Sequence, residues 1–172
     1  MKYTLLFTLL TTSILNASID KIISFEADFT QDIKDEKEKI LSYKGHVYAH
    51  KPQFAKWEYK TPVEKTIFIS PFAITIVEPE IEQVIQRKIE SNFNFFQLIK
   101  NAKEVKKDIY EANYKNTTFT IVKEKKLIKS ISYIDEFENN VIINFTNQKQ
   151  NHKIELEVFT PRYSLEYDIV RD

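Results

Sequence analysis

The sequence of 172 residues contains no cysteine and a single glycine, Gly45, and these absences exclude several classes of function. A chain without cysteine forms no disulfide and offers no thiolate to a metal ion or a substrate. A chain with one glycine cannot build the glycine-rich loops that bind nucleotide phosphates, or the glycine-flanked serine of nucleophile-elbow hydrolases. We therefore expect neither a nucleotide-dependent enzyme of these types nor one of these hydrolases.

The charged residues are balanced and show no pattern typical of a nucleic-acid or metal site. Lysine plus arginine and aspartate plus glutamate each number 25, so the chain lacks the basic excess that favours binding to nucleic acid. His46 and His50 fall in a strand-like stretch, where their backbones would lie about 13 Å apart, too far to share one ion. Glu78, Glu80 and Glu82 have no nucleophilic neighbour and are typical of a solvated strand face. We predict no catalytic residue, no cofactor and no metal.

The N-terminal residues have the pattern of a secretory signal peptide. A positive charge at Lys2 precedes an uncharged, mostly apolar run from Tyr3 to Leu15, and Ala17 offers a small residue before a cleavage point. The run is shorter than the ~20 residues that a membrane-spanning helix needs. We predict that residues 1–17 are cleaved and that residues 18–172 form a single soluble domain in the periplasm. A retained N-terminal anchor is the alternative.

The sequence is rich in aromatic residues, with 13 phenylalanines and 9 tyrosines, and many lie in short segments where apolar and polar residues alternate. Alternation with period two is typical of strands with one buried face. Pro62, Pro71 and Pro161 mark turns between such segments, and short connections favour antiparallel pairing. Further turns are predicted at residues 136–140 and 147–151. The predicted class is mainly β (α+β), with strands within residues 25–31, 46–50, 54–59, 63–69, 72–77, 81–89, 114–122, 127–134, 141–145, 154–159 and 165–170.

Two segments have a helical pattern. In residues 18–25, a serine that can cap the helix precedes isoleucines on one face. In residues 94–102, apolar residues recur at i, i+3, i+4 and i+7, starting from Phe95. Phe93 and Phe96 widen the apolar face of this second helix beyond what a small surface helix needs. We expect the second helix to cover an apolar surface.

A set of short motifs occurs in one order along the chain. The motifs are Phe25-x-Ala27-x-Phe29-Thr30-Gln31, Gly45, Lys51-Pro52 followed by Trp57-x-Tyr59, Pro62, Gln83-Val84 and Leu98-Ile99. In this order and spacing they resemble the LolA family of periplasmic outer-membrane lipoprotein carriers. The resemblance is most informative over residues 25–100, and the C-terminal third matches mainly as a strand pattern with Pro161.

The resemblance implies an unclosed antiparallel β-barrel covered by short helices, which form a lid over an apolar cavity. In this family the cavity accepts the acyl chains of lipoproteins that an inner-membrane ABC transporter complex releases, and surrenders them to an outer-membrane acceptor. Lys51, where many members have arginine, would be the latch that holds the lid. We expect a monomer that is not an enzyme. The expected residues of the cavity and lid are Phe29, Trp57, Tyr59, Phe68, Phe93, Phe95, Phe96, Leu98 and Ile99.

Two other functions fit the same residues. The chain could carry a different amphiphile, such as a glycolipid or a free lipid. It could also be a non-catalytic β-domain that recruits a protein partner, in which case the aromatic residues would form only the core.

Overall fold

The computed structural model describes residues 21–89 and 94–171, and within them most of the alternating segments form strands of one twelve-stranded sheet. The predicted signal peptide and Phe93 lie outside the described residues. No helix in the described residues is long and apolar enough to cross a membrane. The strands are β1 Ser24–Lys34, β2 Ile40–His50, β3 Phe54–Thr61, β4 Lys65–Ile69, β5 Ala73–Glu78, β6 Gln83–Lys88, β7 Lys103–Lys106, β8 Ile109–Tyr114, β9 Thr117–Glu124, β10 Leu127–Ile134, β11 Asn140–Gln150 and β12 Asp168–Arg171. The helical elements are α1 Phe95–Asn101 and the 3-10 helices η2 Pro79–Ile81 and η3 Leu156–Phe159.

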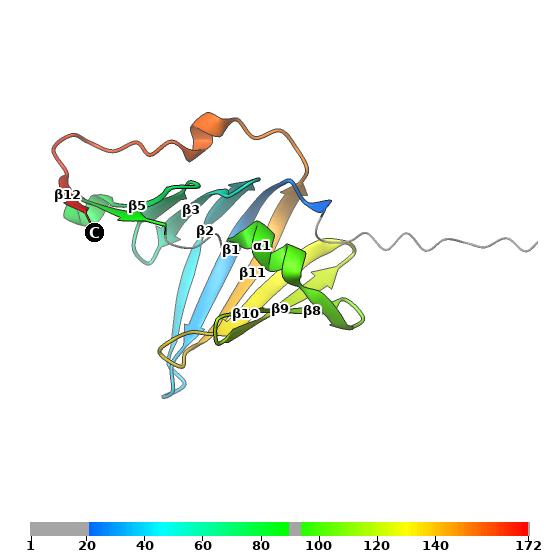
Figure 1. Cartoon of the computed structure of the whole chain (residues 1–172). Coiled ribbons are helices and arrows are strands. Elements are labelled where there is room, and N and C mark those ends of the chain that lie inside the picture. The colour runs from blue at the N-terminus through cyan, green and yellow to red at the C-terminus, as the bar shows by residue number, and fades with distance from the viewer. Residues whose placement is uncertain (1–20, 90–93, 172) are drawn as a thin grey trace, which may run out of the picture.

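The sheet consists of two antiparallel meanders that meet at its centre (Figure 1). One meander is β1 to β6 in chain order and the other is β7 to β11, and β1 pairs with β11 to join them. The predicted antiparallel arrangement is confirmed within and between these meanders. Strand β12 is the exception, because it pairs in parallel with β6. The result is a curved sheet that does not close on itself.

Helix α1 lies across the concave face of this sheet (Figure 1). It connects β6, near one edge, to β7 at the opposite edge, so the chain has to cross the sheet at this point. The side chain of Asn94 caps the helix by accepting hydrogen bonds from two backbone N–H groups of the first turn, at 2.9 and 3.2 Å. Phe95 packs on Phe25 of β1 with ring centroids 4.9 Å apart. The helix predicted at residues 94–102 is therefore confirmed.

The C-terminal segment after β11 covers the opposite, convex face of β3 to β6. Phe159 of η3 packs against Phe54 of β3, with ring centroids 5.6 Å apart. Beyond η3 the segment runs along this face to β12 (Figure 1). This segment thus covers the convex face of β4 to β6. The buried cluster on the convex face consists of Phe68, Val77 and Val84, with Tyr163, Tyr167 and Ile169 packed against it.

Gly45, in β2, occupies a position where the sheet leaves no room for a side chain. A Cβ atom there would lie 2.0 Å from the backbone oxygen of Glu58 and 2.8 Å from the ring of Phe29. The Phe29 ring also contacts Trp57 and Tyr59, at centroid distances of 5.0 and 5.1 Å. The single glycine of the chain therefore makes room for the aromatic cluster of the concave face.

One prediction of element type was wrong, and a second was wrong at its C-terminal end. Residues 154–159 were expected to form a strand, but η3 occupies most of this range, because the C-terminal segment crosses the sheet instead of extending it. Residues 18–25 were expected to form a helix; Lys21 is in a 3-10 helix, but Ser24 and Phe25 already begin β1, where they pair with the end of β2. Residues 18–20 lie outside the described residues.

Three predicted boundaries also differ. The strand predicted at 114–122 is two strands, because Tyr114 ends β8 and Thr117 begins β9. The turn predicted at 147–151 is mostly strand, since β11 continues beside β1 as far as Gln150. The last strand begins at Asp168 instead of residue 165, where its pairing with β6 starts.

Candidate functional site

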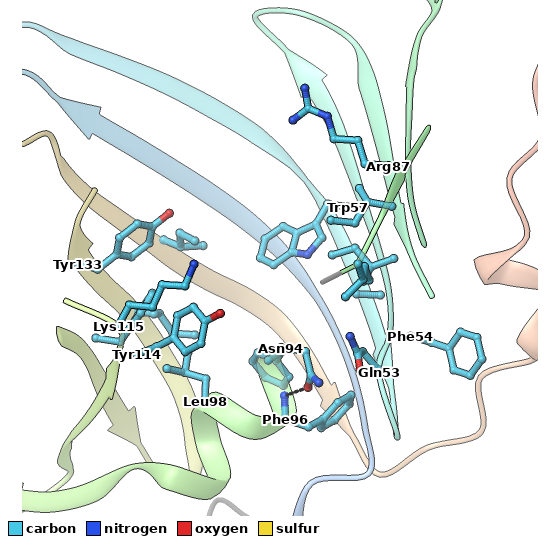
Figure 2. A pocket seen from close by; sticks show the side chains of 18 of the residues that line it. Gln53, Phe54, Trp57, Arg87, Asn94, Phe96, Leu98, Tyr114, Lys115 and Tyr133 are labelled. Atoms are coloured by element: carbon cyan, nitrogen blue, oxygen red, sulfur yellow. Dashed lines mark hydrogen bonds between the residues drawn. The ribbon is translucent and has the colours of Figure 1, made fainter. Parts of the chain in front are cut away.

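A cavity of about 1090 Å³ lies between helix α1 and the concave face of the sheet (Figure 2). Strands of both meanders supply its walls, and α1 covers it. Figure 2 shows Trp57 and Tyr133 projecting from opposite walls, with Leu98 and Phe96 on the helix. The apolar and aromatic residues of the lining are Ala55, Trp57, Ile69, Ile74, Ile89, Phe95, Phe96, Leu98, Tyr114, Phe119, Ile131, Tyr133 and Ile143. Phe54 also borders the cavity, although its ring packs against Phe159 on the other face of β3.

The alternation of each strand explains why these residues share the lining. Ala55 and Trp57 lie two residues apart in β3 and therefore face the same side. The same spacing brings Ile131 and Tyr133 of β10 to the opposite wall. Because the sheet curves, these two walls face each other across the cavity. Such a space suits a long apolar molecule, and its volume slightly exceeds the ~300 to 1,000 Å³ typical of small-molecule pockets.

The polar groups of the lining are few, and the charged ones are basic. Gln53, Asn94, Arg87, Lys88 and Lys115 complete the lining, and no carboxylate belongs to it among the described residues. Among the described residues, the lining therefore pairs no acid with a base in the manner of an acid–base catalyst. Its chemistry favours binding of an apolar body, and basic and amide side chains lie beside the apolar ones.

Two half-buried tyrosines extend this polar character without adding charge. The hydroxyl of Tyr59 donates a hydrogen bond to Oε1 of Gln31 at 2.9 Å. Burial, with a smaller effect of Tyr133 and Tyr43, raises the pKa of Tyr59 far above its ordinary value of 10.0. Burial and the neighbouring Asp135 likewise raise the pKa of Tyr133. Both hydroxyls therefore remain neutral hydrogen-bond donors at physiological pH.

The structure brings four of the predicted site residues to the cavity: Trp57, Phe95, Phe96 and Leu98. Three others, Phe29, Tyr59 and Ile99, belong to the adjoining core. Phe68 requires a correction, because it lies on the convex face with Val77 and Val84. Its neighbours Ile67 and Ile69 face the other way, since side chains alternate along β4. Phe93 lies outside the described residues.

Lys51, the predicted latch, lies in the turn between β2 and β3 and contacts the helix. Its Nζ atom is 6.0 Å from the centroid of the Phe96 ring. Its backbone N–H donates a hydrogen bond to the carbonyl of Ile23 at 2.9 Å, which holds the turn beside the start of β1. The ammonium group thus lies near the Phe96 ring of α1, and Phe96 lines the cavity.

Sequence reasoning missed the wall formed by the second meander. Phe119, Ile131, Tyr133 and Ile143 line the cavity, yet they occur after the motifs that carry the resemblance. The only signal for them was the alternation of their strands, which identifies a shared face but not the face that turns inward. The cavity therefore has a wall from each meander, whereas the predicted residues belonged only to the first meander and to the lid.

The sequence was compared with known families and proteins. Residues 20–162 match the model of the family described as outer membrane lipoprotein carrier protein LolA. A Campylobacter jejuni protein named outer-membrane lipoprotein carrier protein is 44% identical over 148 residues, which cover 86% of each chain. A Wolinella succinogenes protein of the same name is 33% identical over 156 residues, which cover 90% of this chain and 91% of that protein.

Two solved structures share the fold of this chain at low sequence identity. A LolA superfamily protein from Nitrosomonas europaea has a TM-score of 0.54 at 8% identity, covering 84% of this chain and 94% of that one. An uncharacterized conserved protein from Thermus thermophilus has a TM-score of 0.54 at 11% identity, covering 89% of this chain and 93% of that one. These two similarities concern the fold alone.

Proposed function

This chain belongs to the LolA family of outer membrane lipoprotein carrier proteins, and we propose that it carries lipoproteins by holding their acyl chains in the cavity under helix α1. The observation that carries this proposal is the cavity itself, which is lined mainly by apolar and aromatic side chains from both meanders and from the helix. Each CH₂ group removed from water contributes about 0.8 kcal/mol. An acylated protein therefore needs such a cavity to cross an aqueous space, and no chemical step is required.

The carrier receives its cargo from an inner-membrane ABC transporter complex and delivers it to an outer-membrane acceptor. The N-terminal pattern that ends at Ala17 supports export to the periplasm. Residues 18–172 act there as one soluble, monomeric domain. The pairings of β1 with β11 and of β6 with β12 support a single domain, because they tie both halves of the chain into one sheet.

Helix α1 is the lid of this carrier, and Lys51 is its latch. A lid that closes favourably over the empty cavity opposes cargo binding, and this opposition allows the cargo to leave. The contact of the Lys51 ammonium group with the Phe96 ring supports the latch, because a cation over an aromatic ring is attracted by it.

A second candidate is the transport of a free anionic lipid. The basic lining favours it, because Arg87, Lys88 and Lys115 are the charged residues of the cavity among the described ones. Native mass spectrometry of the purified exported protein, followed by lipid extraction, separates the candidates. We expect a bound lipoprotein, and an extract containing only an anionic lipid would support the second candidate instead.

A pair of tryptophan substitutions tests whether the cavity is the binding site. Ala55→Trp places a large ring in the lining, so we expect binding of a diacylated lipopeptide to weaken at least tenfold. Lys60→Trp is the matched control, because Lys60 is exposed on the same strand and lies outside the lining. Equal binding by both variants, each with a cooperative urea transition, would remove the cavity from the proposal.

A further inference from the structure

Gln53 is a buried polar residue in the wall of the cavity. It precedes β3, two and four residues before Ala55 and Trp57, and it lines the cavity with them. Figure 2 shows its amide on the cavity side of β3, whereas the adjacent Phe54 projects away toward the C-terminal segment. Only 8% of Gln53 is exposed. Among the described residues, no hydrogen bond joins its side chain to another group, and its amide on the cavity side is not fully enclosed.

The amide of Gln53 depends on the contents of the cavity for its hydrogen bonds. A glutamine side chain has two N–H donors and one carbonyl acceptor, and a buried polar group without a partner is costly. While the cavity is empty, water can satisfy the amide. Acyl chains that fill the cavity displace that water, because the surrounding lining includes the apolar Ala55, Trp57 and Phe96. The bound molecule must then supply the partner itself.

We propose that Gln53 is a binding residue that recognises the acyl carbonyl of the cargo, the ester or amide group where each fatty chain begins. This inference rests on the proposed function and extends it by naming the polar contact. The amide N–H groups donate to the carbonyl oxygen, which only accepts. The chains then extend from Gln53 along Trp57 toward Ile131 and Ile143 on the opposite wall. Gln53 thereby fixes which end of the cargo lies beside the N-terminus of α1.

A hydrogen bond from Gln53 would make the cavity distinguish acyl chains from alkyl chains of the same length. An acyl chain brings a carbonyl to Gln53, whereas a plain alkyl chain buries the amide without a partner. The expected discrimination is about tenfold in affinity, as for one hydrogen bond lost from a buried group. A purely apolar wall would bind both chains equally, since their buried areas are the same.

The test compares two synthetic lipopeptides in the full mature protein. One carries a cysteine with two ester-linked acyl chains, and the other carries alkyl chains of the same length without carbonyl groups. The fluorescence of Trp57 reports binding, because it is the only tryptophan of the chain and lines the cavity. We expect Gln53→Leu to weaken binding of the ester lipopeptide about tenfold and to leave the alkyl lipopeptide bound at least as tightly. An amide-linked chain distinguishes recognition of any acyl carbonyl from recognition of esters alone.

Gln83→Leu is the control, because Gln83 is a half-buried glutamine of β6 outside the lining. Urea unfolding of each variant establishes that it folds, and Gln53→Asn, which keeps the amide, should restore part of the preference. The inference is overturned if Gln53→Leu changes both affinities equally or changes neither. If the unmodified protein binds neither lipopeptide, the proposed function fails as well, and this outcome is distinct because no substitution is involved.

Discussion

Replacement of Lys51 by leucine tests whether the turn between β2 and β3 holds the lid. The Lys51 Nζ atom lies 6.0 Å from the Phe96 ring centroid, and the side chain is half-buried. A cation–aromatic contact of this kind contributes about 0.5 to 1 kcal/mol. Its loss should shift the lid equilibrium about two- to fivefold toward the open form. We therefore expect Lys51→Leu to accept cargo normally and to release it more slowly to an acceptor.

The assay is the rate at which a fluorescent lipopeptide passes from the loaded carrier to acceptor vesicles. Lys51→Arg should strengthen closure and lower cargo affinity slightly, because a guanidinium group stacks on an aromatic ring better than an ammonium group does. A double-mutant cycle with Phe96→Leu isolates the pair, and Lys60→Leu is the matched exposed control. The latch is refuted if Lys51→Leu and Lys51→Arg both release cargo at the unmodified rate, or if the cycle shows no coupling.

Three further predictions concern stability, each read from urea unfolding. Gly45→Ala should lower the free energy of unfolding by ~3 kcal/mol, since the new Cβ would lie 2.0 Å from the backbone oxygen of Glu58; an unchanged midpoint would contradict this. Lys125→Asn combined with Lys126→Gly should raise the free energy of unfolding by ~1 kcal/mol, because both residues have positive φ in a two-residue hairpin loop. An unchanged free energy of unfolding would contradict this hairpin conformation. Burial raises the pKa of Glu26, but hydrogen bonds from Lys149 and His152 outweigh burial and hold this pKa below its ordinary value of 4.5. The ionised Glu26 therefore stabilises the fold, and this stabilisation is lost as the pH falls through the lowered pKa. Glu26→Gln should lose less stability than the unmodified protein on acidification, and equal losses would exclude a contribution of Glu26.

Local patterns were sufficient to predict most of the sheet and the helix. The alternation in β3 and β10 and the i, i+3, i+4, i+7 pattern that starts at Phe95 each depend on one buried face. Strand β7 gave no such signal. All four of its residues are exposed at the sheet edge, and its sequence is three charged residues around Val105. Charged edge strands of this kind protect a sheet from pairing with other chains, but they do not alternate.

The face of the sheet that lines the cavity could not be read from the sequence. In β4, Ile67, Phe68 and Ile69 are all apolar, because one face of the strand packs in the convex cluster and the other borders the cavity. The C-terminal segment covers the face of Phe68, and its course depends on β12 pairing with β6. Such a long-range contact leaves no local pattern. Gln53 was missed for the same reason, since a lone glutamine beside a turn is ordinary until its burial is known.

Photo-crosslinking of an acylated lipopeptide tests the central claim most directly. The probe carries a diazirine near the end of one acyl chain, and the labelled residues are identified by mass spectrometry. The account predicts labels on the far wall of the cavity, at Phe119, Ile131 or Ile143, and none at Phe68 on the convex face. Labels at Phe68 with none on the cavity wall would contradict the claim that the cavity under α1 holds the cargo.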